Sequence, residues 1–145
     1  MSCVFCDIVA GEAPAIRVYE DDDYLGILDI RPFTRGHTLV LPKRHTVDLT
    51  DTPPDTCVGM VAIGQRIARA ARMSELAADG NNVVINDGRA AFQSVFHIHL
   101  HVVPRHNGDK LSFAKGMLLR RDPDREATGR ILREALAQLD AAQQD

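Results

Sequence analysis

The sequence predicts an α+β fold built around one antiparallel sheet, and three observations support this. Five short runs are rich in β-branched or aromatic residues, the composition typical of strands. Two longer segments repeat apolar residues at the three-and-four spacing of a helix. Only one of these helices interrupts the strand runs, so the strands are expected to pair antiparallel within a single domain, residues 1–145. A chain of 145 residues is long enough to bury a substantial core.

The five expected strands are separated mostly by short polar connections. Asp and Glu fill the connection between the first two runs, residues 20–23, which suits a tight, solvated turn. The runs cover residues 16–19, 24–28, 38–41, 82–85 and 96–103.

Two helices complete the expected fold. The first is central and begins near residues 51–55, where Pro53 and Pro54 are tolerated in the first helical turn. Its apolar stripe consists of Met60, Val61, Gly64, Ile67, Ala68 and Ala71. The second lies near the C-terminus, and its apolar side consists of Ile131, Leu132, Ala135, Leu136 and Leu139. We expect packing or dimer contacts along that side.

Charge and composition exclude several kinds of partner. The chain carries 17 basic and 20 acidic residues in mixed order, for a net charge of -3, and offers no basic stripe for a nucleic acid. No apolar run approaches the roughly 20 residues that span a bilayer, and no leader precedes Cys3. We therefore expect a cytoplasmic protein that binds neither nucleic acid nor membrane. The three cysteines, two of them in Cys3-x-x-Cys6, suit metal binding or burial better than a disulfide framework.

Three histidines in alternation form the most informative feature of the chain. On a strand, His97, His99 and His101 would share one face. The residues expected to face the core are Phe96, Ile98, Leu100 and Val102. A row of three imidazoles replaces apolar side chains on one face of the strand, and the rings repel one another when they are protonated. A strand with only a structural role could avoid this cost, so the row indicates a function. Neutral imidazoles suit two chemistries, a catalytic zinc with an open position or nucleophilic attack on phosphorus, and the spacing does not separate them.

The pattern His-φ-His-φ-His-φ-φ at residues 97–103, where φ is hydrophobic, resembles the defining motif of the histidine-triad (HIT) family. Blocks at residues 29–30, 36–45 and 86–88 resemble the same family in the same order. The resemblance covers residues 3 to about 105 and leaves a tail and helix at 106–145. It implies a HIT-like five-stranded antiparallel sheet with a central helix and a C-terminal helix, assembled as a homodimer.

The nearest likeness is to bacterial nucleoside phosphoramidases, which cleave purine nucleotide conjugates at the α-phosphate. The resemblance implies that His99 attacks phosphorus to form a nucleotidyl-histidine intermediate, which water then resolves. His101 and His37 would contact the phosphate, Asp29 the ribose hydroxyls and Ile30 the base. The remaining implied nucleotide contacts are Asn86, Gln93, Ser94 and Val95. No organic cofactor is implied.

A structural zinc site is a second implication of the resemblance. Many bacterial members pair a Cys-x-x-Cys motif with a histidine after Pro-Lys-x and with the first histidine of the triad. The corresponding positions here are Cys3, Cys6, His45 and His97. Two thiolates and two imidazoles form a closed tetrahedral set, so one zinc per chain would act as a structural ion without a bound water.

One position departs from the family pattern. Phe92 stands before Gln93, where family members usually carry glycine. Phenylalanine disfavours a positive φ, so we expect a reshaped loop or a narrower leaving-group pocket. Two alternatives to a phosphoramidase stay open: a diadenosine polyphosphate hydrolase or phosphorylase, and a non-catalytic nucleotide-binding module. A metallohydrolase with zinc on the three triad histidines is a further alternative.

Overall fold

The protein folds around one five-stranded antiparallel sheet with the strand order β1-β2-β3-β5-β4. The structure is a computed structural model that describes residues 2–143. The strands are β1 (Arg17–Glu20), β2 (Tyr24–Leu28), β3 (Thr38–Pro42), β4 (Gly80–Ile85) and β5 (Leu100–Arg105). The predicted α+β class and the five antiparallel strands are confirmed, with boundaries of the first four strands shifted by at most two residues.

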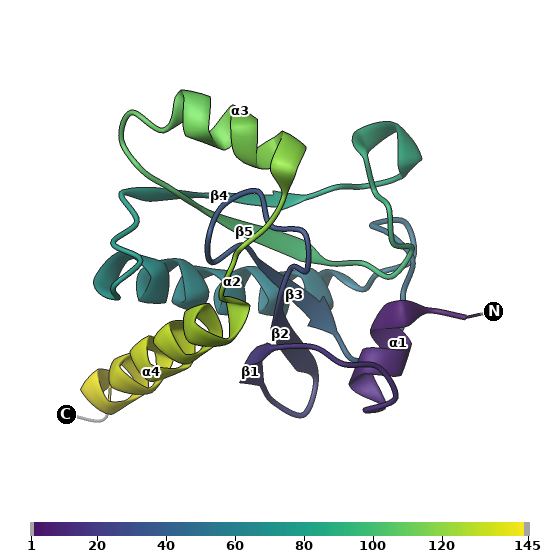
Figure 1. Ribbon diagram of the computed structural model, residues 1–145. Coiled ribbons are helices and arrows are strands. Elements are labelled where there is room, and N and C mark those ends of the chain that lie inside the picture. Colours follow the sequence, from purple (N-terminus) through teal and green to yellow (C-terminus); the bar gives the residue numbers. More distant parts are fainter. Residues whose placement is uncertain (1, 144–145) are drawn as a thin grey trace.

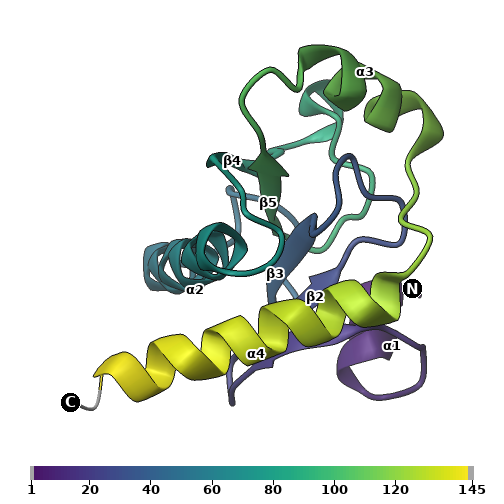
Figure 2. The same ribbon diagram turned by 60° about the vertical axis from the view of Figure 1, so that its left-hand side comes forward.

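Helices cover both faces of the sheet, as Figures 1 and 2 show. They are α1 (Val4–Val9), α2 (Pro54–Met73), α3 (Lys110–Leu119) and α4 (Arg125–Gln143), with a 3₁₀ turn η1 (Arg89–Ala91). α2 lies on one face, whereas α1 and α3 lie on the opposite face (Figure 2). None of the helices within residues 2–143 combines the length and the apolar character that crossing a membrane requires.

The main core lies between α2 and the sheet. The buried side of α2 consists of Met60, Ile63, Gly64, Ile67, Ala70 and Ala71. A Cβ on Gly64 would lie 2.8 Å from a Leu100 methyl carbon, so glycine lets the helix approach β5 closely. The predicted stripe was wrong at Val61, which is half exposed. Val61 is turned by about 100° from buried Met60 around the helix axis and so points away from the sheet.

The predicted C-terminal helix is confirmed as α4, which packs against α2 and β1. Leu132, Ala135 and Leu136 are buried in the same core cluster as the apolar side of α2. The expected packing role of this helix is therefore confirmed, while dimer contacts along it stay a prediction.

The fifth strand begins later than predicted, at Leu100 instead of residue 96. Its pairing with β3 starts at Leu100 and Val40. Before that point the chain is held by other contacts, including a 2.8 Å hydrogen bond from the Ile98 N–H to the Thr46 carbonyl. Phe96 therefore does not face the core as expected, and 40% of its surface is exposed.

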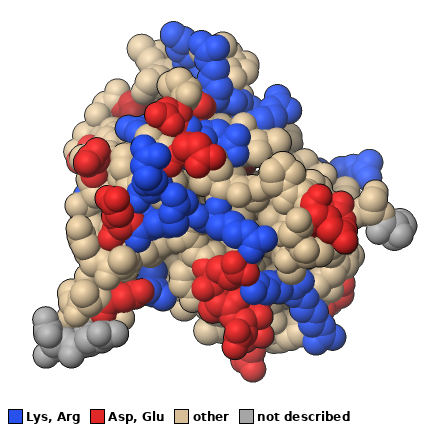
Figure 3. All heavy atoms as spheres, turned by 60° about the horizontal axis from the view of Figure 1, so that its bottom comes forward, with Lys and Arg blue, Asp and Glu red and all other residues tan. Residues whose placement is uncertain are grey.

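Charged side chains of both signs are interspersed on the molecular face seen in Figure 3, where Lys and Arg lie beside Asp and Glu. Ion pairs of the protein include Lys43 with Glu20 at 2.8 Å and Arg105 with Asp109 at 2.8 Å. Basic and acidic residues, which are mixed along the sequence, are thus also mixed on this face of the surface.

Candidate active site and metal cluster

The three predicted catalytic histidines lie together on the sheet face that carries α1 and α3. His37 comes just before β3, His101 is the second residue of β5, and His99 directly precedes β5. The ring centroids of His99 and His101 are 4.9 Å apart, and those of His37 and His101 are 5.2 Å apart. His37 and His99 are buried and His101 is half-buried. His97 belongs to a different group, described below.

A backbone amide fixes the proton positions on two of these rings. The Phe33 N–H donates to His37 Nδ1 at 3.0 Å, so in the neutral ring the proton of His37 lies on Nε2. That Nε2–H then donates to His101 Nδ1 at 2.9 Å, which leaves the proton of His101 on its own Nε2. Within residues 2–143 this His101 Nε2 is buried and has no hydrogen-bond partner. It is a donor ready for a bound ligand.

The ring of His99 is oriented by its neighbour's backbone. Its Nδ1–H donates to the His97 carbonyl at 2.8 Å, so the lone pair of the neutral ring lies on Nε2. Phe5 from α1 packs edge-on against this ring, with centroids 5.1 Å apart. Burial lowers the pKa of His99, which keeps the ring neutral and nucleophilic near pH 7.

The two hydrogen-bonded histidines are also held neutral. Burial, followed by the charge of Arg120, lowers the pKa of His37 to about 3. Burial, followed by neighbouring His99, lowers the pKa of His101 to about 3. Both rings therefore act near pH 7 as neutral groups, each with one donor and one acceptor nitrogen.

Asp29 lies at the edge of this histidine group. Its backbone N–H donates to the His37 carbonyl at 2.9 Å, which closes the loop between β2 and β3. One carboxylate oxygen accepts from the Arg31 N–H at 2.8 Å, and the other lies 3.6 Å from His37 Nε2. Asp29, His37 and His101 have ligand atoms within 4.8 Å of one another, but the two imidazoles already use the facing nitrogens on each other. The adjacent Ile30 is 67% exposed.

The loop before the triad is held from inside by Gln93. Its buried side-chain amide donates to the carbonyls of Val47 and Val95, at 2.7 and 3.1 Å, and its oxygen accepts from the Gly88 N–H at 2.8 Å. The side chain is thus occupied in shaping the loop. Ser94, next to it, is exposed.

Phe92 adopts the backbone conformation that favours glycine. Its φ is 69°, in the left-handed region, and its side chain is 88% exposed. The chain accepts this conformation although phenylalanine is disfavoured there, and the ring points away from the body of the protein. Phe92 does not line the cavity beside His101, and a narrower leaving-group pocket stays a prediction.

That cavity, of about 190 Å³, lies between β4, β5 and α3. Its lining consists of Phe33, Asn82, Val84, Asn86, His101, Val103 and Phe113. Only Asn86 and His101 of these residues were singled out from the sequence. α3, which supplies Phe113, was not predicted because its apolar residues do not gather on one side.

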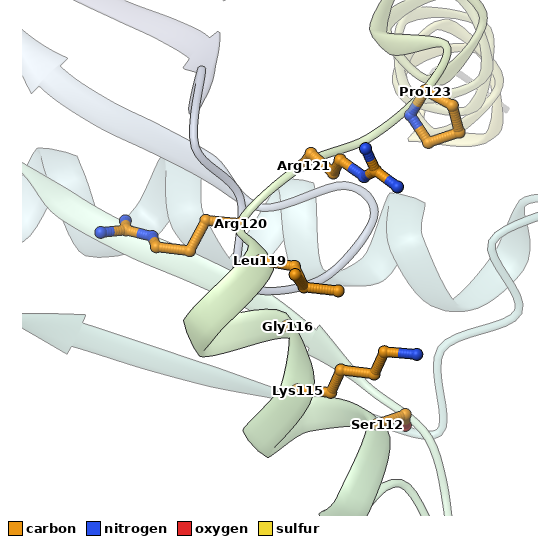
Figure 4. Close-up of a pocket in the computed structure, with 7 residues that line it drawn as sticks. All are labelled: Ser112, Lys115, Gly116, Leu119, Arg120, Arg121 and Pro123. Atoms are coloured by element: carbon orange, nitrogen blue, oxygen red, sulfur yellow. The ribbon is translucent and has the colours of Figure 1, made fainter.

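A larger hollow of about 490 Å³ lies elsewhere, at the junction of α3 and α4. In Figure 4 the side chains of Lys115 and Arg121 extend to one side of the chain and that of Arg120 to the other. Arg120 stacks on the Phe33 ring, 4.4 Å from its centroid. No residue predicted for the site lines this hollow.

The four predicted metal ligands also lie together, with one possible ligand atom from each within 4.8 Å of the others. His97 Nδ1 lies 3.6 Å from both cysteine sulfurs and 3.1 Å from His45 Nδ1, and Cys6 Sγ lies 3.4 Å from His45 Nδ1. Tetrahedral zinc with ordinary bond lengths separates such ligand atoms by about 3.3–3.8 Å. The spacing and chemistry of these donors therefore fit one zinc ion.

Local structure prepares these ligands. Cys3 caps α1, and its sulfur accepts a hydrogen bond from the Cys6 N–H at 3.4 Å. The Nε2–H of His97 donates to the Pro42 carbonyl at 2.7 Å, which leaves Nδ1 free as the metal-facing nitrogen. Both ring nitrogens of His97 thus face groups other than His99 and His101, an arrangement that argues against one catalytic ion on all three triad histidines.

Comparison with known proteins agrees with this geometry. A family model of the HIT domain matches residues 10–108. The chain belongs to the HIT domain family. Among solved structures, it resembles a zinc-bound histidine triad family protein from Mycobacterium smegmatis, with 77% identity, a TM-score of 0.91 and 98% of each chain covered.

Three HIT relatives show the range of names in the family. A HIT-like protein of Mycobacterium tuberculosis (strain H37Rv) is 79% identical over 145 residues, which is all of both chains. An adenylylsulfatase of Arabidopsis thaliana is 41% identical over 75% of this chain and 55% of its own length. An adenosine 5'-monophosphoramidase of Schizosaccharomyces pombe is 35% identical over 74% of this chain and 77% of its own length.

Proposed function

We propose that this HIT protein is a nucleotide hydrolase that cleaves purine nucleoside phosphoramidates, or related nucleotidyl conjugates, at the α-phosphate. The observation that carries the proposal is that the rings of His99 and His101 lie next to each other with complementary ring nitrogens, one carrying a lone pair and the other an N–H. His99 offers a lone pair on Nε2 because its Nδ1–H is bound to the His97 carbonyl at 2.8 Å. His101, with its ring centroid 4.9 Å away, offers an Nε2–H that has no partner in the described part of the chain.

In the proposed reaction, His99 Nε2 attacks phosphorus and the bond from phosphorus to the leaving nitrogen breaks. A proton from the solvent converts the departing nitrogen into a neutral amine. Water then attacks the nucleotidyl-histidine, which releases the nucleotide and restores His99. The Nε2–H of His101 donates to a phosphate oxygen in both steps, and His37 holds the ring that makes this donation.

The remaining assignments concern the nucleotide. We assign Asp29 to the ribose hydroxyls and exposed Ile30 to the base. Asn86, Ser94 and Val95 are assigned to the phosphate side. Gln93 acts there through the loop that its side chain fixes.

We also propose one structural zinc per chain, held by Cys3, Cys6, His45 and His97. The fit of the donor distances and the zinc-bound relative from M. smegmatis support it. When bound, the ion would tie α1 to the segment that carries His99. It would have no open position for water and no part in the chemistry.

Further parts of the proposal concern assembly and location. We propose a homodimer, and the exposed apolar residues Val83 and Val84 on the edge strand β4 support it, because an unprotected strand edge favours pairing. We keep the chain as one domain located in the cytoplasm.

An intact-mass experiment tests the catalytic proposal. Wild type and a His101→Ala variant, in which resolution should be slower, are incubated with adenosine 5'-phosphoramidate. We expect release of AMP by wild type and an added adenylate mass that maps to His99. His99→Ala should give neither product nor adduct while it still binds AMP. A fully active His99→Ala protein would contradict the proposal, and AMP binding without any turnover by wild type would favour a binding module.

A further inference from the structure

We propose that the cavity between α3 and β4 receives the leaving group of the conjugate, and that it selects an uncharged amine carrying about one aromatic ring. The inference rests on the proposed function and goes further by naming the class of amine. It assigns a specificity-determining role to Phe113, which lies outside the residues 10–108 matched by the HIT domain model.

The position of the cavity suits a leaving group. His101 lines it, and the ring of His101 is next to that of His99, so a phosphorus atom attacked by His99 and bound by His101 would lie near the cavity. Asp29 and Ile30, assigned to the nucleoside, do not line the cavity. The space therefore remains available for the other half of the conjugate.

The lining indicates the chemistry of that group. Phe33, Phe113, Val84 and Val103 supply apolar walls, and the polar groups are the amides of Asn82 and Asn86 and neutral His101. Of the residues that the structure describes, no Lys, Arg, Asp or Glu lines the cavity. A charged leaving group would lose hydration there without gaining a counter-ion. The volume of about 190 Å³ compares with about 150 Å³ for a protein cavity that binds benzene.

The wall supplied by α3 is rigidly held against Phe33. A Cβ on Gly116 would lie 2.1 Å from the Phe33 carbonyl oxygen, so the helix backbone packs directly on this loop. Arg120 stacks on the Phe33 ring and donates to the Arg31 carbonyl at 3.0 Å. The rings of Phe33 and Phe113 meet edge to face, with centroids 6.3 Å apart.

Arg105 holds the Phe113 ring and the Asn82 side-chain amide in place. Its guanidinium lies 3.8 Å from the centroid of Phe113 and forms two 2.8 Å hydrogen bonds to the Asp109 carboxylate. It also donates to the Asn82 side-chain oxygen at 2.8 Å, which leaves the amide N–H groups of Asn82 as donors. The charge of Arg105 is thus balanced by Asp109, and the cavity keeps an uncharged lining of fixed shape.

The experiment changes the size of the cavity and follows the preference of the enzyme. Rates are measured with adenosine 5'-phosphoramidates of benzylamine, naphthylmethylamine and aspartic acid. For wild type we expect kcat/KM to be about tenfold or more higher for the benzylamine conjugate than for the aspartate conjugate. Phe113→Ala removes one wall, so the ratio of kcat/KM for naphthylmethylamine over benzylamine should rise about tenfold. Leu111→Ala, at an 87% exposed position of α3, is the matched control and should leave this ratio unchanged.

The outcomes separate this proposal from the proposed function. A ratio that does not change in Phe113→Ala, or equal rates for the aspartate and benzylamine conjugates in wild type, would overturn the pocket assignment while phosphoramidase activity stands. Equal losses on both aromatic conjugates would assign the cavity to the nucleoside instead. Absence of cleavage and of adduct with all three conjugates would overturn the proposed function itself.

Discussion

His37 Nε2 and His101 Nδ1 are joined by a 2.9 Å hydrogen bond, and its direction is set by the backbone N–H of Phe33 in the loop before β3. Because the Phe33 N–H donates to His37 Nδ1, His37 donates through Nε2–H to His101. The Nε2–H of His101 is then left to donate to a ligand. The arrangement requires both rings to stay neutral, since a second proton on either would place two donors face to face.

The stability of the fold should therefore decline in acid. The folded pKa values of His37 and His101 are about 3, whereas the unfolded chain takes up these protons near pH 6.5. Between these values the unfolded state binds more protons, so this stability is present above pH 6.5 and is lost as the pH falls toward 3. Each histidine should contribute a slope of about 1.4 kcal/mol per pH unit within that range.

Urea unfolding at pH 7 and pH 5 measures this effect. We expect the free energy of unfolding of wild type to drop between the two values, and His37→Gln to show a smaller drop because one titrating ring is missing. An equal drop in both proteins would mean that His37 is not the group responsible.

Removal of zinc should destabilise the protein. Cys6→Ser removes one of the four proposed donors, so we expect one zinc per chain in wild type and loss of this zinc in the variant. A ligand present at about 100 times its Kd stabilises by about 2.7 kcal/mol, which corresponds to about 5–10 °C in Tm for a chain of this size. Elemental analysis and thermal unfolding measure the two effects.

Cys57→Ser is the matched control for the zinc prediction. Cys57 lies in α2 and packs against the main core, apart from the metal cluster. The control should keep its zinc. Full zinc content in Cys6→Ser would refute the four-ligand site.

Asp29→Asn should weaken nucleotide binding through the ribose. A hydrogen bond to a charged group is worth about 1.5–3 kcal/mol, so AMP affinity should fall about tenfold to a hundredfold. Binding of 2',3'-dideoxy-AMP, which lacks both hydroxyls, should change little. Calorimetric titration of both ligands checks this, and equal losses for the two would place Asp29 away from the ribose.

Phe92→Gly should stabilise the loop modestly. A residue other than glycine in the left-handed conformation destabilises the folded state by about 1–2 kcal/mol. Glycine removes this strain, but its greater freedom in the unfolded chain offsets about 0.5–1 kcal/mol of the gain. We expect a net gain of about 0.5–1 kcal/mol in the free energy of unfolding, since the 88% exposed ring contributes little packing. Phe92→Ala keeps the backbone penalty and should show no such gain. A gain of the same size in Phe92→Ala would assign the effect to the ring.

Sequence reasoning located the sheet and the two long helices because their apolar patterns are strong and local. It failed at the start of the last strand, where the alternation of residues 96–99 resembles a strand but His97 and Ile98 are bound to other partners. There, tertiary contacts replace the strand ladder. Alternation alone cannot distinguish an extended segment from a paired strand.

The candidate site was reached mainly by resemblance, and α1 and α3 were not predicted. α1 spans six residues, too short for a periodic signal, yet it carries Cys6 and the Phe5 ring that touches His99. α3 holds Phe113 against Phe33, a contact between residues far apart in sequence. Such contacts depend on packing between distant segments and leave no local pattern to read.

The close packing of Gly116 against Phe33 makes the residue type at position 116 an indicator of how α3 is docked. Any side chain there would collide with the Phe33 carbonyl, so α3 could not keep its present position on the loop. When a related protein carries a larger residue at the equivalent place, its third helix must be docked differently. Glycine at this position is thus a marker by which the docking of that helix in other members of the family can be inferred from their sequences alone.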